Sequence, residues 1–134
     1  MRIIVVEYIK ELSDGYIVKF NSPYGSAEGR WVGSKPKLNA EFDIEIDIPE
    51  ILEWEKQINQ IDKDITQITR DENHVILSGV LESVEPDGYS VLRMGDNIVI
   101  FELTGGNYQN YPIGSYVKIK TKQILLYGFG YELN

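Results

Sequence analysis

Glu41-Phe42-Asp43-Ile44-Glu45-Ile46-Asp47-Ile48 alternates acidic and apolar residues without interruption. Successive side chains of a β-strand point to opposite faces of the sheet. The stretch therefore predicts a half-buried strand, with four apolar side chains in a core and four carboxylates outside it. Tyr116-Val117-Lys118-Ile119-Lys120 repeats the alternation, with lysines on the polar face.

Beyond that strand, most of the chain has β-type patterning. Short runs rich in β-branched and aromatic residues lie between turn residues at 75–77, 90–92, 97–101 and 124–127. Asp14-Gly15 and Asp87-Gly88 are dipeptides typical of tight hairpins. These signals predict an all-β fold, or a mainly β fold with one short helix.

The two hairpin signals also reveal an internal repeat with an offset of 73 residues. That shift places Asp14-Gly15-Tyr16 on Asp87-Gly88-Tyr89, and Ile51-Leu52 on Ile124-Leu125. We therefore expect two related β units of about 60 residues, 1–57 and 74–134, joined by a connector at 58–73. Each unit fits an OB-like barrel or a sandwich, and the two units could also share one core.

The segment 50–69 carries two patterns. Its apolar residues fall at 51, 54, 58, 61, 65 and 68, the spacing of an amphipathic helix, and Pro49 suits a first helical turn. However, the repeat maps its start onto a strand, and its many Ile and Thr residues are mediocre helix formers. We favour a strand to about Trp54 followed by an irregular or helical connector, with a full helix over 50–69 as the alternative.

Composition narrows the possible chemistry. The chain has 134 residues, no cysteine and one histidine, which excludes a disulfide framework, a thiol nucleophile and a multi-histidine metal site within the chain. No Gly-x-Ser-x-Gly elbow accompanies His74, and neither glycine-rich loop ends in the Gly-Lys-Ser/Thr of a phosphate-binding loop. We therefore expect no catalytic residue, no metal and no cofactor, and a protein that is not an enzyme.

Hydropathy bears on localisation. No stretch approaches the ~20 apolar residues of a membrane span, and Glu7 interrupts the apolar N-terminal run too early for a signal-peptide core. The expectation is a cytoplasmic protein without membrane contact.

Charge is concentrated in one segment. The formal net charge is -8, and residues 41–64 carry seven of those eight negative charges. A row of like charges is relieved by a cationic surface, so we expect a basic protein as partner and consider nucleic acid unfavourable. The candidate contact residues are the acids of this segment with two tryptophans as anchors: Glu41, Asp43, Glu45, Asp47, Glu50, Glu53, Trp54, Glu55 and Trp31.

A second candidate contact lies in the loop 104–114, which mixes glycine, asparagine and tyrosine. This composition combines adaptable hydrogen bonding with aromatic contact area, as in binding loops. The candidate residues are Asn107, Tyr108, Asn110 and Tyr111.

Residues 75–127 resemble the OB and S1 pattern of small β-barrels. The resemblance rests on 79–84 (Gly-Val-Leu-Glu-Ser-Val), 87–92 (Asp-Gly-Tyr-Ser-Val-Leu), 113–119 and 124–126. It implies that an aromatic at the position of Tyr89 stacks on bases. An OB-like module for single-stranded nucleic acid or oligosaccharide is therefore the alternative function.

As a whole, the chain is similar to the immunity proteins of bacterial toxin systems in its size, its acidity and its lack of a catalytic motif. This resemblance implies a non-catalytic protein that binds a basic partner through an acidic surface. That is the functional expectation we take forward, while the sequence leaves the oligomeric state open.

Overall fold

The computed structural model describes residues 1–128, which form a mixed sheet of 11 strands and one short 3-10 helix. This confirms the all-β class. The strands are β1 (Arg2–Leu12), β2 (Gly15–Ser22), β3 (Gly25–Val32), β4 (Glu41–Glu53), β5 (Ile58–Gln60), β6 (Gln67–Arg70), β7 (Val75–Val84), β8 (Tyr89–Met94), β9 (Asn97–Thr104), β10 (Tyr116–Thr121) and β11 (Leu125–Gly128). The 3-10 helix, η1, spans Tyr108–Asn110. None of the helical structure in this part of the chain is long or apolar enough to span a bilayer.

The alternating stretch forms the first part of β4, as its pattern predicts. Phe42, Ile44, Ile46 and Ile48 are buried, whereas the acids between them lie on the outer face. Burial of these four side chains fixes the register, because a slip by one residue would place the carboxylates in the core.

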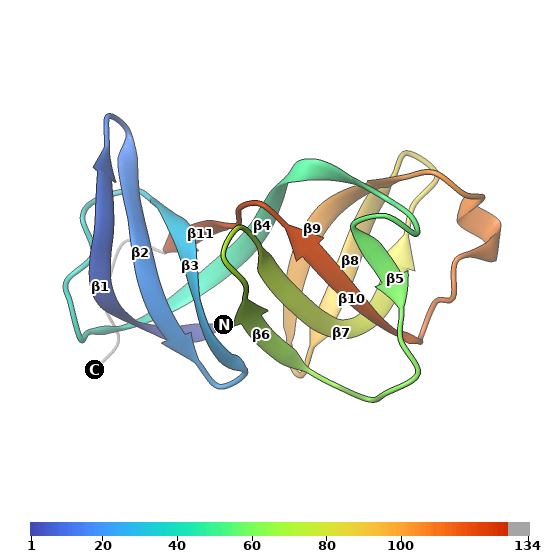
Figure 1. Ribbon diagram of the computed structural model, residues 1–134, viewed down its shortest axis with the longest axis horizontal. Helices are drawn as coiled ribbons and strands as arrows, with labels where there is room; N and C mark the ends of the chain where they lie inside the picture. Colours follow the sequence, from blue (N-terminus) through green and yellow to red (C-terminus); the bar gives the residue numbers. More distant parts are fainter. Residues whose placement is uncertain (129–134) are drawn as a thin grey trace.

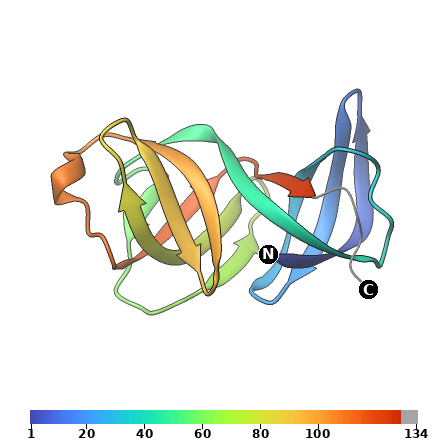
Figure 2. The ribbon, with the colours of Figure 1, turned by 180° about the vertical axis from the view of Figure 1, so that it is seen from behind.

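The strands close into two rings, which appear as two lobes in Figures 1 and 2. The first ring runs β1-β2-β3-β11-β4. It closes where β4 pairs with β1, with Asp43 opposite Arg2. The second ring runs β4-β9-β8-β7-β10-β5 and closes at a bridge between Trp54 and Ile58. β6 pairs with β7 at the side of the second ring.

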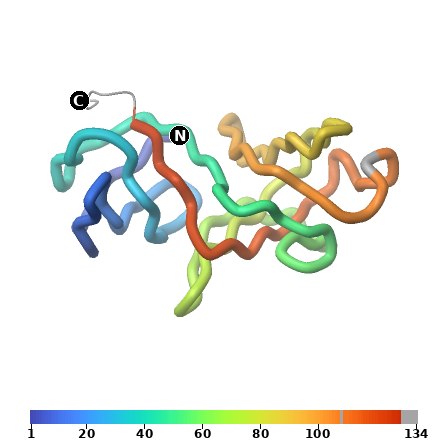
Figure 3. Tube along the Cα trace, turned by 90° about the horizontal axis from the view of Figure 1, so that it is seen from above, coloured from blue at the N-terminus to red at the C-terminus, as the bar shows by residue number. Residues whose placement is uncertain are grey.

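The two rings exchange strands. β4 starts in the first ring and ends in the second, where residues 51–53 pair in parallel with β9. β11 follows the second ring in sequence but pairs in parallel with β3 and antiparallel with β4, in the first ring. Figure 3 shows these two segments passing between the lobes. Each ring is therefore completed by a strand from the other half of the chain.

One feature of this exchange agrees with the 73-residue shift. Arg30 pairs with Leu125, and the shift converts that pair into Leu103 with Leu52, which are also paired. Other registers differ: three residues of β1 pair with β4, whereas six of β7 pair with β10. The common origin of the two halves thus stays a prediction.

Segment 50–69 contains no helix. β4 continues to Glu53, Trp54 forms a bridge, and β5 and β6 follow the turn. The favoured strand to about Trp54 is confirmed, and the connector holds two short strands in place of a helix. The apolar residues do not share one face, because Ile51 is 57% exposed while Ile58 and Ile68 are buried.

Buried apolar side chains of both rings form one cluster, with Phe20 and Ile46 from the first and Leu92 and Ile119 from the second. The halves therefore share a core.

Candidate functional site

The outer face of the first part of β4 carries four acids, and we call the last three, Asp43, Glu45 and Asp47, the acidic row. Strands pair with β4 on both sides, so these side chains point away from the core. Asp43 also accepts a hydrogen bond from the amino group of Met1 at 3.0 Å. Glu45 and Asp47 therefore form the open part of the row.

Charge repulsion within the row is not neutralised. Burial, and then the charge of Glu45, raise the pKa of the Asp47 carboxyl above its usual value. Among residues 1–128, neither Glu45 nor Asp47 takes part in an ion pair. On β4, Asp47 lies between Leu125 of β11 and Ile100 of β9, whose apolar side chains remove water from it.

The other acids of the segment have partners within the protein. Glu41 lies 3.8 Å from Arg2, and Glu53 forms a 2.7 Å ion pair with Lys56. These two acids lie before and after the acidic row on β4, and their basic partners partly neutralise their charge.

Glu50 has an internal role. Its carboxylate accepts hydrogen bonds from the Thr121 hydroxyl at 2.7 Å and from the Lys122 amide at 3.0 Å. Thr121 is fully buried, so Glu50 ties β4 to the end of β10. Glu55 is exposed in the turn after β4, at a positive φ of 69°.

The two tryptophans differ from the expected anchors. Trp31 is only 4% exposed: it packs edge-on against Phe42, and its indole nitrogen donates to the Ser34 carbonyl at 2.7 Å. It is therefore part of the core and exposes almost no surface to a partner. Trp54 is partly buried and packs edge-on against Tyr111.

The loop 104–114 is ordered by its own contacts. Asn107 caps η1 by accepting a hydrogen bond from the Gln109 amide at 3.0 Å, and Asn110 is exposed. Tyr111 is 9% exposed and donates its hydroxyl to the Gly105 carbonyl. The side chain of Tyr108 lies outside the described part of the structure. Of the loop candidates, Asn107 and Asn110 face solvent, while Tyr111 closes the end of the second ring.

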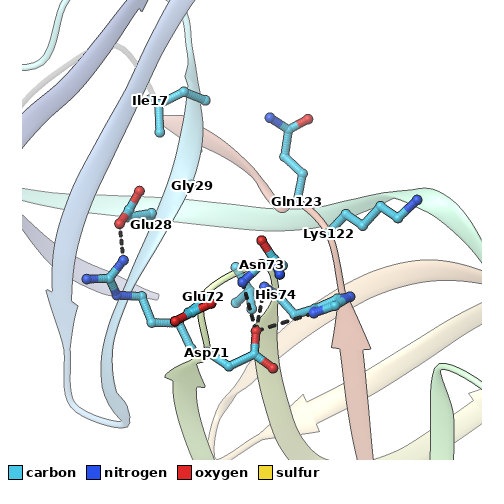
Figure 4. Close-up of a pocket in the computed structure, with 11 residues that line it drawn as sticks. Ile17, Glu28, Gly29, Asp71, Glu72, Asn73, His74, Lys122 and Gln123 are labelled. Atoms are coloured by element: carbon cyan, nitrogen blue, oxygen red, sulfur yellow. Dashed lines mark hydrogen bonds and ion pairs between the residues drawn. The ribbon is translucent and has the colours of Figure 1, made fainter.

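A polar groove of about 390 Å³ contains the only histidine of the chain (Figure 4). Side chains reach it from β3, from the turn between β6 and β7, and from the segment between β10 and β11. Asp71 accepts hydrogen bonds from the amides of Asn73 and His74, and it forms an ion pair with Lys120 at 3.1 Å. The Asn73 amide and Lys120 hold the pKa of Asp71 well below its usual range.

In this groove the histidine lies beside a carboxylate. The His74 imidazole lies 3.3 Å from Asp71, an arrangement that could orient a general base. No serine, threonine or cysteine is among the residues that line the groove in the described part of the chain. A second ion pair, Arg70 with Glu28, spans the groove from β6 to β3. The charged groups of the groove thus connect the two rings.

Metal binding finds no support in the described residues, where no cluster of three or more histidine and acidic side chains could hold an ion. The acids of β4 point outward side by side and do not converge.

Sequence reasoning missed an apolar surface next to the acidic row. Ile51, Tyr89 and Ile98 are 57%, 47% and 48% exposed, on neighbouring strands of the second ring. The signal was present in 98–101, where four apolar residues in succession place apolar side chains on both faces of a strand.

Comparison of the chain with protein-family models, curated proteins and solved structures gives no match.

Proposed function

We propose that this protein is a non-catalytic binding module that holds a basic protein against the acidic row of β4. The observation that carries this proposal is that Glu45 and Asp47 lie side by side on the outer face without an ion pair among residues 1–128. Burial, and then the charge of Glu45, raise the pKa of Asp47 there. A bound Lys or Arg side chain would offset the repulsion between these two carboxylates, and this makes the free energy of binding more favourable.

Rigidity also favours this role. Each side of β4 is hydrogen-bonded, to β11 and to β1 or β9, so the acidic row is held without a mobile loop. A preorganised surface loses little conformational entropy on binding. The net charge of -8 would attract a cationic partner at long range and speed association. The likeness in size and acidity to immunity proteins makes a basic toxin the first class of partner to examine.

The test uses labelled octalysine as a cationic probe, followed by fluorescence anisotropy at about 20 mM and about 300 mM NaCl. We expect binding at low salt that weakens steeply at high salt. The double variant Glu45→Lys with Asp47→Lys should abolish it.

Glu7→Lys with Glu11→Lys is the matched control, because it changes the net charge equally at two exposed acids of β1. It should retain most of the affinity. An equal loss of octalysine affinity in both double variants would show that only net charge matters, and it would overturn the assignment of the acidic row. An affinity that does not change with salt would overturn it as well.

A second candidate function rests on Tyr89, which is 47% exposed on β8. In an OB-like barrel this strand belongs to the ligand-binding face, where aromatics stack on bases or sugars. Asp87 and Glu102 line the same hollow as Tyr89 and would repel phosphates, which makes an oligosaccharide the better ligand of this class. Shifts of the Tyr89 amide on addition of a glucose hexasaccharide, without shifts on addition of a thymidine dodecanucleotide, would support it.

A further inference from the structure

Exposed apolar side chains gather on one outer face of the second ring. Of the six large hydrophobic residues exposed among those described, Ile51, Tyr89 and Ile98 lie on the adjacent strands β4, β8 and β9. Two of the others, Ile4 and Ile9, are on β1, and one is in a loop. Single exposed apolar residues are normal, whereas a gathering on one face marks an interaction surface.

Strand register makes this face continuous. Glu102 of β9 pairs with Ile51 on one side and with Tyr89 on the other. Two residues along β9, Ile100 pairs with Val91 and with Asp47 in the same way. Diagonal neighbours on one sheet face are about 7–8 Å apart, so Ile100 lies within reach of Tyr89.

A hollow of about 290 Å³ opens in this face, lined by Asp47, Asp87, Tyr89, Ile100 and Glu102 among others. It lies where β4 carries extra residues: Asp47 pairs with Ile100, but the next paired residue, Ile51, is opposite Glu102. Pro49 within this bulge has no amide hydrogen to pair with β9. The crossing of β4 from one ring to the other therefore creates the hollow.

Acids border the apolar residues. Asp47 joins this face to the acidic row, and Asp87 and Glu102 line its hollow. Arg93, which pairs with Ile98 between β8 and β9, lies 3.5 Å from Glu82 on β7. A second copy of this chain would bring acids against acids, so the charge of the face favours a basic occupant.

We infer that the face formed by Ile51, Tyr89, Ile98 and Ile100 extends the partner-binding surface, and that it takes a polypeptide segment carrying both apolar and basic side chains. This inference rests on the proposed function and names the chemistry of the partner. Apolar side chains of the segment enter the hollow and cover Tyr89, while its Lys or Arg side chains reach Asp47 and Glu102. Apolar contact supplies the part of the affinity that salt does not screen.

The experiment compares two octapeptides of equal charge, one alternating lysine with leucine and one alternating lysine with serine. Amide shifts are followed by ¹H–¹⁵N NMR at low and high salt. We expect both peptides to shift Glu45 and Asp47 at low salt. Only the lysine–leucine peptide should also shift Tyr89, Ile98 and Ile100, and only its binding should persist at high salt.

Two variants test the side chains. Tyr89→Ser with Ile98→Thr should weaken binding of the lysine–leucine peptide about tenfold, the size expected for loss of anchoring contacts, and leave the lysine–serine peptide unaffected. Ile4→Thr with Ile9→Thr is the matched control, because it removes apolar surface of similar exposure on β1. It should bind both peptides as the unaltered protein does.

Different failures identify different errors. This inference would be overturned if both peptides shifted only the amides of the acidic row. It would also be overturned if the variant Tyr89→Ser with Ile98→Thr bound the lysine–leucine peptide with unchanged affinity. Either result would leave the proposed function standing. Absence of binding of either peptide at low salt would overturn the proposed function. Concentration-dependent shifts of Tyr89 and Ile98 without peptide would show a second copy as the occupant and overturn the assignment to a basic segment.

Discussion

Asp47 is the residue where folding and the proposed binding make opposite demands. In the folded protein its carboxylate is partly desolvated and lies close to the charge of Glu45, and both effects raise its pKa above the usual 3.8. In the unfolded chain these effects are absent. Ionisation of Asp47 therefore favours the unfolded state, and a bound cation would reverse that penalty.

Asp47→Asn should stabilise the protein at neutral pH. A raised pKa means that the folded state holds the proton more tightly, so the penalty is absent below about pH 3.8 and appears as the pH rises through the folded pKa. We expect a gain of about 0.5 kcal/mol at pH 7, the scale of exposed charge interactions, which disappears at about pH 3. Urea unfolding at the two pH values measures it.

Asp43→Asn is the control. Asp43 accepts a hydrogen bond from the Met1 amino group, so this variant should be less stable than the unaltered protein. A gain for Asp47→Asn that is the same at both pH values would contradict the electrostatic explanation. Asp47→Asn should also weaken octalysine binding.

Among the elements, β3 shows what the sequence could not specify. Gly29 is a glycine inside a strand, which signals a bulge or a close approach of another segment. The approaching segment is β11: a Cβ added at Gly29 would lie 2.9 Å from Cγ and Cδ1 of Leu126. Local patterning predicts both strands, but nothing in it identifies a partner so distant in sequence.

Gly29→Ala should cost about 1–3 kcal/mol, because the added methyl group overpacks the contact with Leu126. Leu126→Ala alone should cost about 2–5 kcal/mol, because it leaves a cavity in the core. Combined, the two should cost clearly less than their sum, since the smaller side chain makes room for the methyl group. Urea unfolding of the four proteins measures the coupling, and strict additivity would show that the two residues do not meet.

The same limit explains the outcome for β4. Alternation over 41–48 predicts the strand, its buried face and the acidic row, because these depend on nearest neighbours. It does not reveal which acids have partners: Glu50 is bound by residues more than seventy positions away. The apolar face around Tyr89 was missed for a similar reason, because its members come from three separate strands.

For the whole molecule, the exchange of β4 and β11 makes each ring depend on the other half of the chain. Without β11, the facing edges of β3 and β4 lose their partner strand. Without β4, β9 loses the partner strand that residues 46–47 and 51–53 provide. The two units expected from the repeat are therefore interlocked in this structure.

Fragments 1–63 and 64–134, divided in an exposed stretch between β5 and β6, test this interlocking. We expect neither fragment alone to show a cooperative thermal transition by circular dichroism, because each lacks a strand of its own ring. An equimolar mixture should recover β-structure and one transition, as should the intact protein. Cooperative unfolding of fragment 1–63 alone would contradict the prediction.

The position of β11 also sets a timetable for folding during synthesis. The first ring has β1, β2, β3 and the first part of β4 by residue 48, yet its closing strand begins at residue 125. At ~5–20 residues per second, those unpaired edges wait roughly 4–15 seconds for their partner. Unpaired edges template aggregation, and charged side chains oppose it. The acidic row borders that open edge of β4, so Glu45 and Asp47 would keep nascent chains apart before they meet any partner.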